Sequence, residues 1–274
     1  MIYLECSVGA MSSKGSRVQL SPTSARVAVI AITAATYAVG KAVTGFIPTP
    51  WNVGEVLIAV FLPAFMAVVA ETLPVAIGTG IGTFIGDYFV RTTPILSLVA
   101  GVPANFVGIL LFGWFVKKYK SWSSFVAATV AFLTLGNLIA AVNVVLFLGL
   151  PTGLILGFVV YWNTTGIPAI IVAVPLLVRA VRPLFGRSRI LANPPEWSSI
   201  AGRRQVAVAL LFGMLYVLIG AVIFLGDSAS VAALSNNGLS LIGYFAVAAI
   251  VVIVFGPLAS VVAGSRVGAK QAAR

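Results

Sequence analysis

The sequence predicts an all-α membrane protein, a polytopic bundle of transmembrane helices. Of its 274 residues, 60% are hydrophobic and only 8% are charged, and the mean hydropathy is +1.11. A soluble domain carries roughly 25% charged residues and about 45–50% apolar ones. One globular core of this length does not hide so much apolar surface, so lipid is the expected solvent for most of it. We therefore expect a multi-pass protein of the cell membrane.

Eight apolar stretches are long enough to be transmembrane helices, since a hydrocarbon layer about 30 Å thick takes roughly 20 residues. They cover about residues 25–47, 53–71, 74–90, 95–116, 122–149, 153–178, 205–226 and 239–264. The third stretch is short and contains Gly78, Gly80, Gly82 and Gly86. This composition is typical of close helix packing rather than of lipid exposure.

A polar, arginine-rich segment, 183–204, interrupts the hydrophobic pattern and is typical of a cytoplasmic linker. It divides a six-helix membrane domain from a two-helix addition. The predicted organisation is an N-terminal cytoplasmic tail (1–24), a six-helix membrane domain (25–182), this linker, a C-terminal transmembrane hairpin (205–264) and a cytoplasmic tail (265–274).

The positions of the basic residues predict the orientation of the bundle. With the N-terminus inside, fifteen of the 17 Lys and Arg residues fall in cytoplasmic segments, and only Lys41 and Arg91 fall toward the outside. An excess of Lys and Arg is typical of cytoplasmic loops. Both termini are therefore predicted to be cytoplasmic.

The composition also excludes several classes of function. The chain has no histidine and a single cysteine, Cys6, which excludes histidine-ligated haem, Ser-His-Asp triads and histidine-containing zinc sites. No catalytic residues, no metal site and no cofactor are expected, and the protein is not expected to be an enzyme. Without a basic stripe interleaved with exposed aromatic residues, no nucleic-acid partner is expected.

Four charged residues fall within the outer part of the predicted bundle: Lys41, Glu55, Asp87 and Arg91. Charges at membrane depth are costly, so each needs a partner or a use. Two interpretations stand side by side. The charges form ion pairs that fix neighbouring helices, or they contact a ligand.

A group of amide and aromatic side chains falls at middle to outer depth on the spans 95–116, 122–149 and 153–178. These residues are Asn105, Asn137, Asn143, Tyr161, Trp162 and Asn163. Amides donate and accept hydrogen bonds, and aromatic faces stack on flat rings. For a single Asn the favoured interpretation is a hydrogen bond between helices. For the group, the shared depth favours a pocket for a small solute.

The loop after the first span is stiffened by Pro48 and Pro50 and carries Trp51 and Asn52. Trp51 is compatible with an interfacial anchor of the aromatic belt. It is equally compatible with a lid over an outward-facing pocket.

The first span has two stripes of small residues. Ala31 and Ala35 form one, and Ala34, Ala38 and Ala42 form the other. Such patterns allow close backbone approach, and packing inside the bundle is their usual role. One stripe is also suited to a partner helix.

Together these features resemble the substrate-binding (S) component of energy-coupling-factor (ECF) transporters, which take up vitamins. The resemblance covers about residues 25–182. The residues that carry it are the Ala-x-x-x-Ala stripe Ala31 to Ala35, the Pro-containing outer loop, the Pro- and Gly-rich stretch 62–87 and the basic turn 117–120. The last two spans depart from the six-helix pattern of that family.

The resemblance implies a small-molecule site near the outer face, covered by the loop that carries Trp51 and Asn52. It implies that Ala31 and Ala35 contact a transmembrane coupling subunit and that cytoplasmic ATPases drive release of the solute. Because the chain has no Gly-x-x-x-x-Gly-Lys-Ser/Thr motif, ATP hydrolysis is expected from partner subunits. The alternative is a non-transporting structural subunit of a larger membrane complex.

Overall fold

The computed structural model describes residues 21–45, 48, 49, 51, 53–90, 94–185 and 191. Within these residues the protein is all-helical and has no strand, and five helices are long and apolar enough to cross a membrane. These features support a multi-pass membrane protein. Several predicted segments lie outside the described residues. They are residues 1–20 of the N-terminal tail, the linker 183–204 apart from 183–185 and 191, the hairpin 205–264 and the C-terminal tail 265–274.

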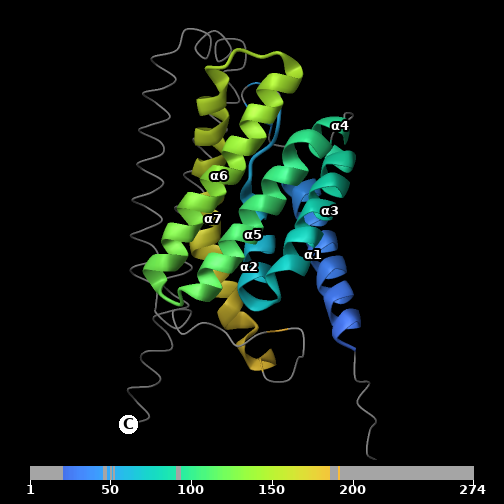
Figure 1. Ribbon diagram of the computed structural model, residues 1–274, viewed down its shortest axis with the longest axis vertical. Helices are drawn as coiled ribbons and strands as arrows, with labels where there is room; N and C mark the ends of the chain where they lie inside the picture. The colour runs from blue at the N-terminus through green and yellow to red at the C-terminus, as the bar shows by residue number, and fades with distance from the viewer. Residues whose placement is uncertain are drawn as a thin grey trace, which may run out of the picture.

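The helices form a bundle in which α2 is much shorter than its neighbours (Figure 1). Their bounds are α1 Pro22–Thr44, α2 Phe61–Val69, α3 Thr72–Val90, α4 Pro94–Leu96, α5 Val102–Lys118, α6 Trp122–Leu148 and α7 Leu154–Ala180. A 3-10 turn, Ile58–Val60, leads into α2, and another, Arg182–Leu184, follows α7. The described part of the chain thus contains six helices, because α4 and α5 are continuous from Pro94 to Lys118.

Short capped turns define several helix ends. The Ser21 hydroxyl accepts a hydrogen bond from the backbone N–H of Ser24, and Pro22 occupies the first helical position of α1. Ser121 caps α6 in the same way. At its other end, α6 stops at Gly149, whose φ of 64° lies in the left-handed region that glycine adopts without steric cost.

Helices α1 and α3 pack closely because glycines of α3 face α1. A Cβ atom at Gly78 would lie 2.6 Å from the carbonyl oxygen of Ile30, and one at Gly82 would lie 2.7 Å from that of Ala34. A Cβ at Gly86 would lie 2.8 Å from the Cβ of Lys41. The expected role of these glycines in helix packing is therefore confirmed.

The helix from Pro94 to Lys118 contains a π-helical turn over Ser97–Gly101. Pro103 follows directly and has no N–H to donate to the helical ladder. The N–H of Val102 donates to the carbonyl of Ser97, five residues earlier. π-Turns of this kind widen a helix locally and are frequent at functional sites.

The structure differs from the sequence prediction at the second span. The expected helix over 53–71 is instead a 12-residue helical stretch, Ile58–Val69, about 18 Å long at 1.5 Å per residue. Residues 53–57 are not helical, and Gly54 has a φ of 94°. Non-helical backbone is tolerated at membrane depth only where protein or a cavity surrounds it. Residues 53–57 are therefore expected to be surrounded by other helices or to line a cavity.

The start of α1, the end of α5, the start of α6 and the end of α7 lie at one end of the bundle (Figure 1). These segments and the residues next to them carry most of the basic side chains in the described part of the chain, namely Arg26, Lys117, Lys118, Lys120, Arg179 and Arg182. Lys117 extends between helices and donates to the backbone carbonyl of Ala70 and to Thr72. Arg26 pairs with Glu71 at the same end. We call this the basic end, and positive charge of this kind is typical of the cytoplasmic side.

Cysteine labelling tests this orientation. In a Cys6→Ser background, Thr152→Cys, in the exposed turn between α6 and α7, is expected to react with a membrane-impermeant maleimide on intact cells. Lys120→Cys, exposed at the basic end, is expected to react only after permeabilisation. The reverse pattern would show that the basic end faces outward.

Candidate functional site

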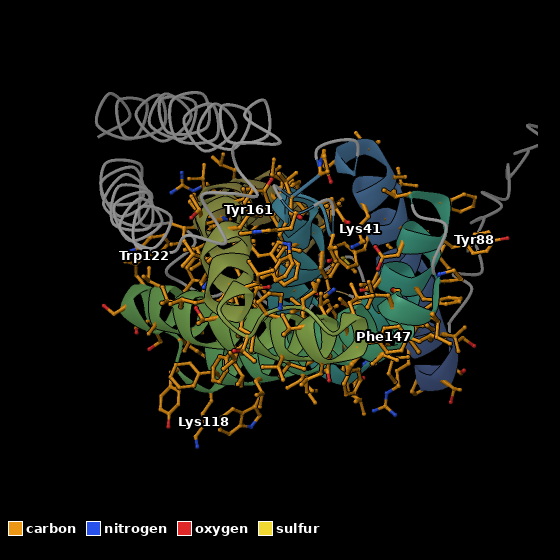
Figure 2. All side chains as sticks on the ribbon, turned by 90° about the horizontal axis from the view of Figure 1, so that it is seen from above. Lys41, Tyr88, Lys118, Trp122, Phe147 and Tyr161 are labelled. Carbon is orange, nitrogen blue, oxygen red and sulfur yellow. The ribbon has the colours of Figure 1, made fainter. Side chains whose placement is uncertain are left out.

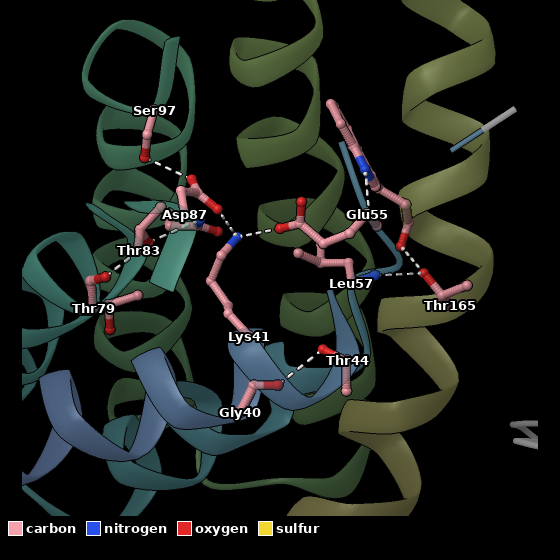
Figure 3. A network of polar contacts seen from close by, with 12 residues as sticks. Gly40, Lys41, Thr44, Glu55, Leu57, Thr79, Thr83, Asp87, Ser97 and Thr165 are labelled. Carbon is pink, nitrogen blue, oxygen red and sulfur yellow. Dashed lines mark hydrogen bonds and ion pairs between the residues drawn. The ribbon is translucent and has the colours of Figure 1, made fainter. Parts of the chain in front are cut away.

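Three charged side chains meet inside the bundle, away from the basic end. Lys41 of α1 places its Nζ 2.5 Å from Oε1 of Glu55 and 2.8 Å from Oδ1 of Asp87 of α3. Their exposed fractions are 6%, 5% and 5%. Figure 3 shows the Lys41 ammonium between the two carboxylates. Lys41 therefore forms ion pairs with both Glu55 and Asp87, as the first of the two interpretations expects, whereas Arg91 lies outside the described residues.

Local packing brings these three groups together. The absence of a side chain at Gly86 lets α3 approach α1 at Lys41, which brings the neighbouring Asp87 within reach of the ammonium group. Ser97, the first residue of the π-helical turn, donates a 2.6 Å hydrogen bond to Oδ2 of Asp87. The π-turn thus supports the carboxylate from the side opposite α1.

The charged network opens onto a cavity of about 60 Å³, which we call the polar cavity. Its polar lining comes from Lys41, Glu55, Asp87, Ser97, Asn105 and Asn137, and Trp162 is in its wall. A buried water requires at least about 10–15 Å³ of such space. The polar cavity therefore has room for a few waters or one compact chemical group.

The loop 48–57 contains Glu55 and is held against α7 by three hydrogen bonds. The Tyr161 hydroxyl donates to the carbonyl of Pro48 (3.2 Å), and Nε1 of Trp162 donates to the carbonyl of Glu55 (3.1 Å). The backbone N–H of Leu57 donates to Thr165 (3.1 Å). These bonds satisfy part of the irregular backbone of the loop.

Trp51 also holds the loop against α7. Its ring packs against Phe158, with ring centroids 4.7 Å apart, and against Tyr161 at 6.5 Å. A Cβ atom at Gly157 would lie 2.8 Å from the indole, so the glycine provides the space for it. In the view along the bundle, Tyr161 and Lys41 lie among the helices, whereas Tyr88 and Lys118 extend to the periphery (Figure 2).

The structure brings some of the expected site residues together and separates others. Asn105 and Trp162 line the polar cavity, and Tyr161 and Trp51 hold the loop beside it. Asn143 is partly buried and does not line this cavity. Asn52 lies outside the described residues.

Asn163 forms bonds between helices instead of lining the cavity. Its Oδ1 accepts from Asn137 (2.8 Å), and its Nδ2 donates to Thr134 (3.0 Å). Both partners lie on α6. Asn163 therefore links α6 to α7, and through Asn137 it supports the wall of the polar cavity.

Asn163→Ala is accordingly expected to lower the free energy of unfolding by about 1–3 kcal/mol, because it leaves buried amide and hydroxyl groups of α6 unsatisfied. Thermal unfolding of the purified protein measures this loss. Asn143→Ala is the matched control, with no measurable change expected. An unchanged melting temperature for Asn163→Ala would show that these bonds contribute little.

Among the residues that the structure describes, no group of three or more His, Cys, Asp or Glu side chains is placed to hold a metal ion. Comparisons with known protein families, with curated proteins and with solved structures give no match to this chain.

Proposed function

We propose that this chain is a membrane-embedded solute-binding subunit for uptake of a small, vitamin-like molecule, energised by partner ATPase subunits. The observation that supports this most is the polar cavity, which places three charges and two amides inside an apolar helix bundle. Polar groups at membrane depth are expensive and mark solute or ion pathways. Ion pairs alone would need no cavity beside them.

The loop 48–57 is the proposed gate of this site. It carries Glu55 at the cavity and Trp51 against α7, and it is held by individual hydrogen bonds rather than by a continuous helix. The cavity is much smaller than the about 300–1,000 Å³ of drug-sized ligand pockets. Entry of a whole solute would therefore require the loop to lift, and only a compact group of the solute would occupy the present cavity.

The proposed coupling surface is the exposed face of α1 that contains Ala31 and Ala35. Two residues of the second small-residue stripe, Ala34 and Ala38, are buried and lie against α3, whereas Ala42 is exposed. Ala31 and Ala35 leave a shallow face on which a helix of a transmembrane coupling subunit could approach closely.

Ala31→Trp and Ala35→Trp are expected to abolish association with the coupling subunit while leaving the fold intact, because a bulky side chain holds two helix backbones apart. Copurification of the subunits in mild detergent measures this. Ala127→Trp, at an exposed position of α6, is the matched control and is expected to leave association intact. Equal association of all three variants would remove α1 as the coupling surface.

Identification of the copurifying subunits tests the proposed function. A transmembrane subunit together with ATPases that carry a Walker A motif is the expected result for an uptake system. A stable complex that contains no ATPase would instead support the alternative, a structural subunit. That alternative is consistent with the interhelical bonds of Asn137 and Asn163.

A further inference from the structure

Two amide side chains, Asn105 of α5 and Asn137 of α6, line the polar cavity and also a second, smaller cavity of about 10 Å³. The two cavities therefore lie side by side at these amides. Close helix packing brings the amides there, since a Cβ atom at Gly136 would lie 2.9 Å from the carbonyl oxygen of Ala104. Because α5 and α6 touch at this point, the residues that follow, Asn105 and Asn137, lie at a common depth of the bundle.

The orientation of the Asn105 amide is set by its partner on α3. The Thr83 hydroxyl donates its single hydrogen to the carbonyl of Thr79 (2.8 Å), so toward Asn105 it acts as an acceptor. Nδ2 of Asn105 donates to this hydroxyl at 3.1 Å. The amide oxygen, Oδ1, is therefore the atom that remains for the cavity.

The Asn137 amide is held in the same manner by α7. Its Nδ2 donates to Oδ1 of Asn163 (2.8 Å), and Asn163 is held in turn by Thr134. Within the described part of the chain, Oδ1 of Asn105 and Oδ1 of Asn137 accept no hydrogen bond. Neither oxygen is fully enclosed by protein, so both are accessible from the cavities that their residues line. The site thus presents two fixed amide oxygens.

Two carbonyl oxygens inside a membrane protein need donated hydrogens, because a buried acceptor without a donor is costly. Water supplies these hydrogens in the absence of a solute, and a solute that displaces the water has to supply them instead. A hydroxyl group has one hydrogen to donate, whereas an amide NH₂ group or a cyclic urea has two. The second cavity is lined mainly by apolar side chains, such as Ile109, Phe112 and Leu133, and such surroundings favour an uncharged group.

We propose that the polar cavity recognises an uncharged N–H-bearing group of the solute, such as a primary amide or a cyclic urea, through the Oδ1 atoms of Asn105 and Asn137. Thr83 and Asn163 line neither cavity and are positioning residues, because their bonds turn the two amide oxygens toward this group. The inference deepens the proposed function and rests on it, since it assigns the chemical class of the group by which the solute is held.

Acetamide and acetone are the probes that test this inference. They have the same number of non-hydrogen atoms and differ only in that acetamide has an NH₂ group where acetone has a methyl group. Each has a methyl signal on which saturation-transfer NMR with the purified full chain measures binding, with empty detergent micelles as the blank. Acetamide is expected to bind at least about tenfold more tightly than acetone. Equal binding of the two probes, or binding of neither, would overturn the inference.

Variants of the amide site extend the test. Asn105→Leu removes one amide oxygen and keeps a side chain of similar size, so it is expected to weaken acetamide binding by about tenfold or more and to leave acetone unchanged. Asn143→Leu, at a partly buried position that does not line the polar cavity, is the control and is expected to bind acetamide as the unaltered protein does. Equal acetamide affinity of these two variants would overturn the inference.

Thr83 is tested by a pair of variants. Thr83→Val removes the hydroxyl that orients Asn105 and is expected to weaken acetamide binding, whereas Thr83→Ser keeps this hydroxyl and is expected to restore the affinity of the unaltered protein. Should Asn105→Leu fail to fold, equal acetamide affinity of the two Thr83 variants would still overturn the inference.

The amide site and the uptake function fail separately. Selective acetamide binding by a chain that copurifies with no ATPase would support the amide site and refute the uptake function. Release of a retained solute that has no N–H group would overturn the inference and leave the uptake function intact.

Discussion

Lys41→Met is expected to lower the free energy of unfolding by about 3–5 kcal/mol, because it removes the ammonium group that both buried carboxylates contact. Lys41, Glu55 and Asp87 are each at least nine-tenths buried. Removal of one member of such a group costs far more than the pair itself contributes, since the remaining charges are still buried.

Arg26→Met is the matched control for this experiment. It also removes the cation of an ion pair, but the side chains of Arg26 and Glu71 are 60% and 51% exposed. Water replaces the lost partner at such a site, so no measurable change in stability is expected. Thermal unfolding of both variants in the same detergent provides the comparison. Similar small losses for both variants would contradict the burial of the charged network.

Gly82→Ala is expected to destabilise the protein by about 1–3 kcal/mol, and Gly78→Ala by a similar amount, because neither added methyl group fits between α3 and α1. At both positions the new Cβ would lie within 2.7 Å of a backbone carbonyl oxygen of α1. Backbone atoms do not rotate away, so the two helices must separate. The loss extends to the charged network, since Lys41 and Asp87 lie on these two helices.

Gly80→Ala is the control on the same helix. A Cβ at Gly80 would lie 3.4 Å from a side-chain carbon of Val102, which is an ordinary van der Waals contact. Its stability is expected to equal that of the unaltered protein or to exceed it slightly, because alanine favours the helix. Equal losses for Gly80→Ala and Gly82→Ala would show that helix propensity or flexibility, and not the α1–α3 contact, explains the glycines.

The sequence was sufficient to predict most of the described helices and to identify the buried charges. Long apolar runs have few alternatives to a membrane helix, and α1, α3, α6 and α7 lie close to their predicted bounds. Lys41, Glu55 and Asp87 were recognisable because charges within apolar spans require a partner. The sequence left the choice between ion pairing and ligand contact open. The structure shows the ion pairs and adds a cavity beside them.

The short length of α2 could not be predicted from the sequence. The stretch 53–71 is apolar enough to span the membrane, and its hydropathy contains no sign that residues 53–57 leave the helix. The backbone of Glu55 and Leu57 forms hydrogen bonds with Trp162 and Thr165, more than 100 positions away along the chain. Contacts of this kind arise only when α7 is in place.

The sequence predicts the membrane depth of the candidate site residues, but not which of them face the interior of the bundle. Asn105 and Asn143 occupy suitable depths, but only Asn105 lines the polar cavity. Which face of a helix points inward depends on its rotation in the bundle, and the spans here are apolar on all sides, which weakens the periodic signal. Asn137, which belongs to the same predicted group, also lines the cavity, whereas Ser97 was not predicted as a site residue.

The central claim is that the polar cavity holds a solute, and mass spectrometry of small molecules retained by the purified protein tests it most directly. Ala140→Leu fills the cavity from α6 without removing a polar group, and Ala127→Leu places the same side chain at an exposed position of the same helix. The unaltered protein and Ala127→Leu are expected to release the same solute on denaturation, whereas Ala140→Leu and Asp87→Asn are expected to release none. Equal release from all four proteins, or from none of them, would contradict the claim.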